Sequence, residues 1–383
     1  MALPGPFRSV TICGLAAAIL VAGCGPTSKL LRSEIRKDGA GVYVEAVPFV
    51  RQRRAWCGPA ALASVAQHYG IALTQEQIAG EVYLPSIGAT LTIDLARAAR
   101  RHGLWCHSGR GSARDVRTWL HRGVPVIALV KQRSPLGTSL HYLVLTGYHE
   151  RRGYLIAHTG ILPNRPLSLD RFAREHSDAG GWLLAACPPD RVDWPLDPKG
   201  HNDLGLLFER EGKLDRAQAE YQRAIAAEPA NPLFHFNLGN VLARAADRPA
   251  AQSAYRKAIG LRPAFADAHN NLACLLLDMG HRHQALSAAR RAVTIDGPRV
   301  ASYLDTLGRA QLALGRHAPA AETFRQAIDE AGSDADTLAD ARLGLIQALV
   351  GSGKHTQAIA EKNRLLASTT DPTLHQRAER LLR

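Results

Sequence analysis

Three residues have the types and spacing that nucleophilic catalysis by a thiol requires: Gln52, Cys57 and His141. Cys57 precedes an apolar pattern of helical period over residues 61–69, so its thiol is expected at a helix N-terminus, where unpaired N–H groups favour the thiolate. Gln52 can direct an amide N–H toward a substrate carbonyl oxygen, beside the backbone N–H of Cys57. His141 can take the thiol proton. These residue types predict an acyl-enzyme mechanism.

The segments around these residues alternate between helical and extended patterns. Apolar positions recur at helical spacing in residues 61–69, 91–102 and 113–121. Continuous apolar runs predict a buried strand over residues 124–130 and a hairpin over 139–148 and 153–158. Since His141 opens the hairpin, its ring can meet a thiol at a helix N-terminus. The pattern predicts an α+β domain with its site between helix and sheet.

These residues resemble a known family, the papain-like bacteriocin-processing (double-glycine leader) cysteine peptidases and their freestanding relatives. The match covers about residues 45–187 and rests on Gln52, on the run from Cys57 to Leu62 and on the run from His141 to Tyr148. The resemblance implies a papain-like α+β fold, a Cys nucleophile, a His base, a Gln in the oxyanion hole and hydrolysis of peptide bonds. This chemistry needs no metal or organic cofactor.

The residue that orients the imidazole departs from the family pattern. The family usually has Asp or Asn followed by Pro on the strand after the histidine strand, and here that place holds His158 without an Asp or Asn. We predict that His158 accepts a hydrogen bond from His141 as a neutral imidazole. Asn164 or Asp170, from the following loop, are the alternatives. Without a carboxylate the nucleophile and base would still act, at lower efficiency.

The second half of the chain repeats with offsets of 34, 34 and 35 residues. Leucine followed by Gly or Ala recurs at Leu204, Leu238, Leu272 and Leu307. A larger set of small and aromatic positions recurs in step: Ala217, Ala251, Ala285, Ala320, Tyr221, Tyr255 and Phe324. The pattern resembles tetratricopeptide repeats, in which small residues allow two helices to approach closely. We expect the aromatic residue to fill the space between units.

Residues 201–383 are therefore predicted to form an all-α tetratricopeptide-repeat solenoid of about four units plus a degenerate capping unit. Its concave groove is expected to bind a peptide or protein partner; the alternative is that the helices only stabilise the chain. A proline-rich stretch over residues 188–200 predicts an extended linker to the peptidase domain, residues 46–187.

The N-terminus has the pattern of a targeting signal. Residues 1–23 combine Arg8 with an apolar run over residues 10–21 that is too short to span a bilayer, as in a signal peptide. The run ends in small residues before Cys24, which resembles the lipobox of bacterial lipoproteins. This resemblance implies acylation of Cys24, a lipidated tether over residues 24–45 and a periplasmic location at the outer membrane. The membrane is expected as a partner through the lipid alone.

Composition sets further limits. A chain of 383 residues is too long for one ordinary core, and 46% hydrophobic with 21% charged residues excludes both a disordered and a polytopic membrane protein. The net charge of +13 is distributed as scattered arginine with no basic helix, so nucleic acid is not expected as a partner. Four cysteines remain beyond Cys24, without the spacing of a metal site: Cys57, Cys106, Cys187 and Cys274. A Cys106–Cys187 disulfide is left open.

Two functions follow from these observations. The leading prediction is a lipid-anchored periplasmic cysteine peptidase whose repeats bind a protein substrate or partner. The alternative is a non-catalytic adaptor whose peptidase-like domain only binds peptides, because an acidic orienter is missing; a transferase that passes the acyl group to an amine is a smaller possibility. The chain has no transport spans and no nucleotide-binding motif, so cleavage of double-glycine leaders is not expected.

Overall fold

The computed structural model describes residues 26–53, 55–134, 137–295 and 297–382. The predicted signal peptide and Cys24 lie outside these residues. The chain divides into two compact units, Met1–Pro195 and Leu196–Arg383. The first is α+β and the second is built from helical repeats, which confirms the predicted fold class.

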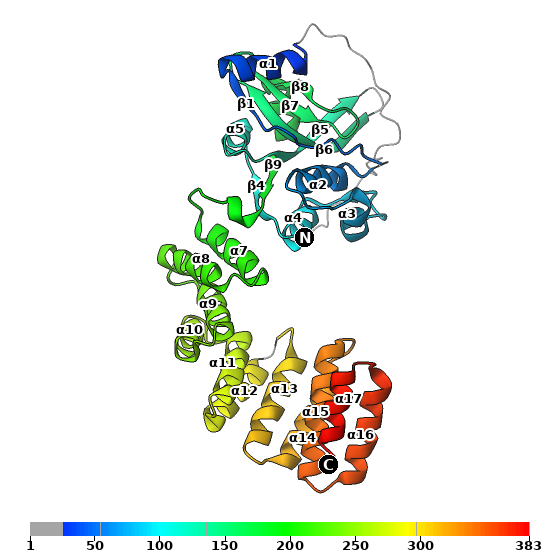
Figure 1. The fold of residues 1–383 in the computed structure, drawn as a ribbon, viewed down its shortest axis with the longest axis vertical. Helices are drawn as coiled ribbons and strands as arrows, with labels where there is room; N and C mark the ends of the chain where they lie inside the picture. The colour runs from blue at the N-terminus through cyan, green and yellow to red at the C-terminus, as the bar shows by residue number, and fades with distance from the viewer. Residues whose placement is uncertain (1–25, 54, 135–136, 296, 383) are drawn as a thin grey trace, which may run out of the picture. The chain divides into compact units, whose positions relative to one another are not determined.

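Unit 1 is organised around a seven-stranded antiparallel sheet (Figure 1). Its strands are β1 (Gly41–Tyr43), β4 (Trp105–Arg110), β5 (Val126–Ser134), β6 (Gly137–His149), β7 (Tyr154–His158), β8 (Arg165–Ser168) and β9 (Trp182–Cys187). The order is β4-β9-β5-β6-β7-β8, and β1 pairs with the end of β6. β2 (Tyr83–Leu84) and β3 (Ala89–Thr90) form a separate small sheet. The predicted hairpin is confirmed as the antiparallel pair of β6 and β7.

The described residues of unit 1 form six α-helices: α1 (Ser28–Asp38), α2 (Cys57–His68), α3 (Gln75–Val82), α4 (Thr92–Arg101), α5 (Ala113–His121) and α6 (Leu169–Asp178). Every residue of α2 from Gly58 to Ala66 is buried, which explains its continuous apolar sequence and weak amphipathic pattern. Capping boxes at Thr74 and Ser112 start α3 and α5. Figure 1 shows α2, α3 and α4 grouped together, and the helix that begins at Cys57 also packs against β6.

The predicted tether over residues 24–45 is corrected by α1 and β1. Thr27 caps α1 by accepting a hydrogen bond from the backbone N–H of Leu30. Leu31 is fully buried against Ile156 of β7, and Glu34 forms an ion pair with Arg152 at 2.6 Å. β1 then adds to the sheet beside β6. Residues 28–43 are therefore part of the domain.

The predicted linker over residues 188–200 is also largely folded. Pro189–Arg191 form a short 3-10 helix. The Trp194 ring packs against Trp105 and Trp119, with centroid distances of 5.9 and 5.6 Å, and the Arg122 guanidinium lies over the Trp194 ring. This cluster attaches the stretch before Pro195 to unit 1. Pro198 then occupies the first turn of α7, as prolines often do.

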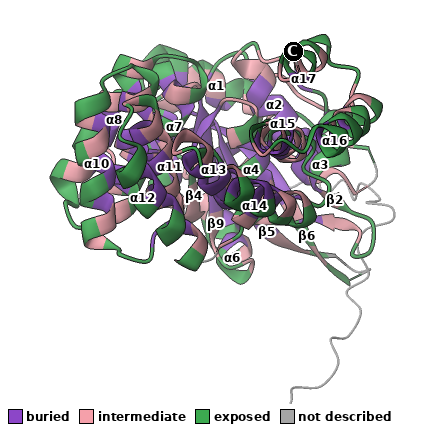
Figure 2. Cartoon of the chain, turned by 90° about the horizontal axis from the view of Figure 1, so that it is seen from below, coloured by how far each residue is buried: buried purple, intermediate pink, exposed green. Residues whose placement is uncertain are grey.

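Unit 2 contains the repeat helices, coloured from green to red in Figure 1. They are α7 (Pro198–Arg210), α8 (Leu214–Ala227), α9 (Pro232–Arg244), α10 (Arg248–Leu261), α11 (Ala266–Asp278), α12 (Arg282–Ile295), α13 (Val300–Ala313), α14 (His317–Glu330), α15 (Ala335–Gly351), α16 (His355–Ser368) and α17 (Pro372–Arg380). Figure 2 shows buried faces along these helices and exposed faces outside them. The predicted final unit is α15 and α16, followed by α17.

The aromatic position of the repeats packs against glycine. A Cβ on Gly205 would lie 2.7 Å from the Tyr221 ring, and one on Gly239 would lie 2.6 Å from the Tyr255 ring, so these two rings lie against the glycine of their own unit. Phe324 lies against Gly308 of its own unit and also against Gly344 of the next, so this ring fills the space between units as predicted. Close approach of the two helices requires glycine at these positions because any side chain would overlap the ring.

Candidate active site

Cys57 is the first residue of α2 and its thiol is half-buried. No side chain caps this helix, so its first N–H groups remain directed at the thiol region. Gly58 is needed here for packing: a Cβ would lie 3.2 Å from the Tyr142 ring and 3.3 Å from Thr90. The side of Gly58 where a Cβ would lie therefore faces Tyr142 and Thr90.

His141 lies on β6, opposite Val130 of β5, and forms a hydrogen bond with Cys57. Burial raises the pKa of the Cys57 thiol, but the hydrogen bond and charge of His141, together with the backbone N–H groups of Tyr142 and Gly58, lower it overall. Burial lowers the pKa of His141, but Cys57 and the Thr159 carbonyl raise it overall. The opposite shifts favour a thiolate–imidazolium pair.

The second ring nitrogen of His141 is held by the main chain. Nε2 donates to the carbonyl oxygen of Thr159 at 2.6 Å, which leaves Nδ1 for the thiol. A turn fixes this carbonyl: the Thr159 N–H donates to the Leu162 carbonyl at 3.0 Å, and the Leu162 N–H donates to Thr159 Oγ1 at 3.2 Å. A main-chain carbonyl therefore orients the imidazole.

The prediction that His158 orients His141 is wrong. Nε2 of His158 donates to the Val47 carbonyl at 3.0 Å, and Nδ1 accepts from the Asn164 N–H at 3.1 Å. Both ring nitrogens are thus used by the backbone, and the ring attaches the segment before the nucleophile to β7. Burial lowers the pKa of His158, in keeping with a neutral ring that donates at one nitrogen and accepts at the other.

The two alternatives also lie elsewhere. The Asn164 side chain accepts a hydrogen bond from the Tyr43 hydroxyl at 3.0 Å. Asp170 is exposed in the first turn of α6. Neither forms a described contact with His141, so Thr159 has the role that sequence reasoning sought among side chains.

Gln52 lies against the same turn. Its N–H donates to the Gly160 carbonyl at 2.8 Å, and its side chain packs on Gly160, where a Cβ would collide with it. Gln75, which is only 7% exposed, holds both neighbours of Gln52: it donates to the Arg51 carbonyl and accepts from the Arg53 N–H, each at 3.0 Å. The predicted oxyanion residue is therefore positioned through backbone contacts on both sides.

A small cavity connects these elements. Its lining residues are Val50, Cys57, Ala60, Ala61, Ser64, Tyr142, Val144, His158 and Gly160. Cys57 and Gly160 both line this space, and the Gln52 side chain packs on Gly160. Among the described residues, no group of His, Cys, Asp and Glu is arranged to hold a metal ion.

Both units contain segments that match models of known protein families. Residues 44–161 match the Peptidase_C39 like family, residues 205–245 match a TPR repeat model and residues 270–335 match a tetratricopeptide repeat model. The chain carries a Peptidase_C39-like domain followed by tetratricopeptide repeats. A search of curated proteins gives no match.

Several solved structures are similar to part of the chain. The crystal structure of MamA protein is 20% identical and covers 45% of this chain and 91% of its own, with a TM-score of 0.40. PilF of Pseudomonas aeruginosa is 19% identical, covers 48% and 80%, and has a TM-score of 0.43. YrrB, described as a TPR protein with an unusual peptide-binding site, is 18% identical, covers 48% and 92%, and has a TM-score of 0.40.

The C39-like domain thus contains three residues that sequence reasoning missed or assigned differently: Thr159, Gln75 and His158. Thr159 acts through its carbonyl, which has no sequence signature. Gln75 follows the capping residue Thr74 and reads as an ordinary first-turn residue. Cys106 and Cys187 are free thiols on adjacent strands, each buried, so the open question of a disulfide between them is answered in the negative for this structure.

Proposed function

We propose that the C39-like domain is a cysteine peptidase. The observation that supports this most directly is the hydrogen-bonded pair of Cys57 and His141, with a lowered thiol pKa and a raised imidazole pKa. A cysteine with only a packing role would not need a helix N-terminus beside its thiol and a histidine hydrogen-bonded to it.

The reaction follows from these roles. The Cys57 thiolate attacks the carbonyl carbon of a peptide bond, and the oxygen becomes an oxyanion that accepts hydrogen bonds from the Cys57 N–H and the Gln52 amide. The His141 imidazolium transfers its proton to the leaving amine as the C–N bond breaks. His141 then takes a proton from water, the hydroxide attacks the thioester, and the acid leaves with the thiolate restored.

The Thr159 carbonyl is compatible with this cycle but is weaker than a carboxylate. It fixes the ring and the position of the Nε2 proton, while a neutral oxygen stabilises the imidazolium less than a negative charge. A slow peptidase is therefore expected. The same feature favours the second candidate, an adaptor that binds peptides without cleaving them.

The repeats and the N-terminus complete the proposal. Tetratricopeptide repeats supply extended surfaces for peptides or proteins, so the second unit is proposed to bind the substrate or a partner of the peptidase. Cys24, outside the described residues, is proposed as the site of acylation that anchors the chain in the periplasm at the outer membrane. None of the helices in the described part of the chain could span a membrane.

The rate of Cys57 alkylation by iodoacetamide across pH tests the catalytic proposal. The labelled peptide is identified by mass, because Cys274 is also partly accessible and serves as an internal control. We expect Cys57 to react through a pKa well below about 8.5, and His141→Ala to abolish that advantage. Ordinary thiol reactivity in both proteins would instead support the adaptor.

A further inference from the structure

An open hollow of about 840 Å³ lies on unit 2. None of its lining residues belongs to the candidate active site of unit 1. The hollow is formed by α10, α11, α12 and the residue that precedes α14. The lining residues are Arg256, Ile259, His269, Leu272, Leu276, His283, Gln284, Leu286, Ser287, Ala288, Arg290, Arg291, Thr294 and Arg316. No Asp or Glu is among these described lining residues.

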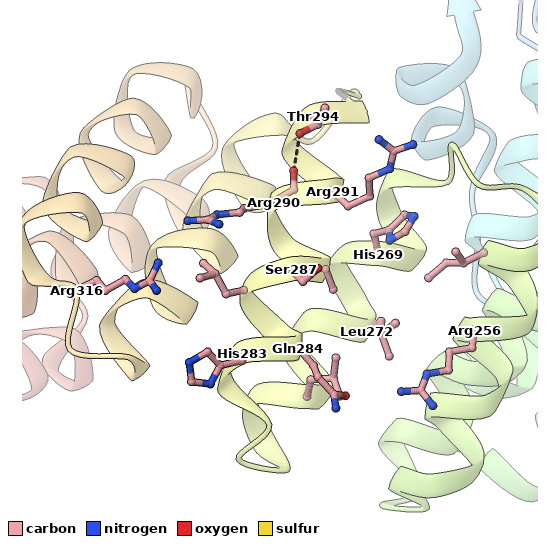
Figure 3. A pocket seen from close by; sticks show the side chains of 14 residues that line it. Arg256, His269, Leu272, His283, Gln284, Ser287, Arg290, Arg291, Thr294 and Arg316 are labelled. Carbon is pink, nitrogen blue, oxygen red and sulfur yellow. Dashed lines mark hydrogen bonds between the residues drawn. The ribbon is translucent and has the colours of Figure 1, made fainter.

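Four arginines line the hollow around α12 (Figure 3). Arg256 lies on α10 and Arg316 directly precedes α14, and Arg290 and Arg291 extend from α12 in opposite directions. All four are exposed. Their clustering corrects the expectation that the arginines are scattered without a basic helix.

The charge of this surface is uncompensated. α10 and α12 contain no acidic residue, whereas α8 and α14 in the flanking units do. Arginines elsewhere in the repeats have carboxylate partners, as in Arg244–Glu209 and Arg299–Asp267. Within the described residues, none of the four hollow arginines forms an ion pair. Unpaired charges of one sign around a single hollow favour an anionic partner.

The floor of the hollow is apolar and rigid. Leu272, Leu276 and Leu286 are buried beneath the arginines. The ring of His269 is fixed by donating Nε2–H to the Pro263 carbonyl at 3.1 Å. Burial, and then the charge of Arg291, lower the pKa of His269, so this ring adds polarity rather than charge at neutral pH.

We propose that this hollow binds an acidic segment of a protein partner, with its carboxylates on the arginines and an apolar side chain on the leucine floor. An arginine guanidinium binds a carboxylate through two parallel hydrogen bonds, so each of the four arginines could hold one acidic side chain of the partner. Proteins that bind single-stranded nucleic acid use aromatic side chains on which the bases stack, whereas this hollow has an aliphatic floor. The proposal does not depend on peptidase activity.

The test measures binding of a fluorescently labelled peptide of alternating Glu and Leu to the full chain, beside the same peptide with Gln in place of Glu. We expect saturable binding of the acidic peptide only, weakened by salt. Arg290→Glu/Arg291→Glu should raise Kd about tenfold or more, because charge-assisted hydrogen bonds are replaced by repulsion. Arg256→Gln/Arg316→Gln removes two charges without reversing them and should also raise Kd. This second variant tests the proposal if the first does not fold.

Lys199→Glu/Lys354→Glu is the matched control, since both lysines are exposed on unit 2 and lie outside the hollow. It should leave Kd unchanged. Equal weakening by this control, or unchanged binding in both arginine variants, overturns the proposal. Tighter binding to phosphatidylglycerol vesicles or to single-stranded DNA than to the peptide would assign the surface to another class of partner. Self-association of the chain that the arginine variants abolish would assign it to a second copy.

Discussion

The Nε2 atom of His141 lies 2.6 Å from the carbonyl oxygen of Thr159, so the main chain holds the imidazole that faces the Cys57 thiol. Substitution of a side chain cannot remove this acceptor. Its position depends on the turn at residues 159–162 and on Gly160, whose φ is +75°. The backbone conformation of this turn therefore sets the orientation of the His141 imidazole.

Thr159→Ala and Gly160→Ala should differ sharply. The first removes the side-chain bond of the turn but keeps the carbonyl and the bond from the Thr159 N–H to the Leu162 carbonyl, so the Cys57 alkylation rate at neutral pH should stay within about threefold. The second forces a Cβ into the Gln52 side chain at a left-handed φ, which displaces the turn and should slow alkylation about tenfold or more. Alkylation rates of the two variants, measured beside the parent, check this. Equal rates would show that the carbonyl does not orient His141.

His158 should contribute to stability and not to the pH profile of Cys57. His158→Ala leaves the Val47 carbonyl and the Asn164 N–H without their partner, so the free energy of unfolding should fall by about 1–3 kcal/mol. The pKa of Cys57 from alkylation should be unchanged. Urea denaturation and the alkylation profile separate the two effects, and a shifted thiol pKa would restore His158 as an orienter.

The lowered pKa of His158 also predicts a pH dependence of stability. The unfolded ring titrates near its ordinary value of about 6.5, and the folded ring titrates lower. Below pH 6.5 the unfolded state binds more protons, so the stability from this group is present above 6.5 and is lost as the pH falls through the folded pKa. The slope of stability against pH in this window should be smaller in His158→Ala than in the parent.

Gln75 should act on the oxyanion side of the site. Gln75→Leu removes the hydrogen bonds to Arg51 and Arg53 that flank Gln52, so affinity for a peptide aldehyde, whose hemithioacetal oxygen occupies the oxyanion hole, should fall about tenfold. Gln67→Leu is the control, because it removes a single hydrogen bond to Leu73 at the far end of α2. Both variants should lose stability, and only the first should lose aldehyde affinity. Equal losses would make Gln75 merely structural.

Two glycine substitutions in the repeats should have opposite signs. Gly239→Ala places a methyl group inside the Tyr255 ring and should lower the free energy of unfolding by about 1–3 kcal/mol. Gly260→Ala, near the end of α10, meets no atom within 4 Å and should raise it by about 0.5–1 kcal/mol. Thermal unfolding of each variant checks the sign. A neutral Gly239→Ala would contradict the close packing of the two helices.

The features of this protein that depend on local periodicity were predictable from the amino-acid sequence. Helical spacing after Cys57, the apolar strands that begin near His141 and the 34-residue period each reflect contacts within one element or between adjacent ones. Residue types at such positions are selected by burial and by helix geometry, so they can be read along the chain. The fold class was predictable for this reason.

Two kinds of contact could be found only in the folded structure: contacts between segments that are distant in the sequence, and contacts made by main-chain atoms. The Thr159 carbonyl that holds His141 belongs to the backbone, which every residue shares, and so leaves no pattern in the sequence. α1 docks on β7 through Leu31 and Ile156, which are far apart along the chain. The arginines of the hollow lie on α10, on α12 and directly before α14, and each looks like an ordinary exposed residue until the repeats stack around one hollow.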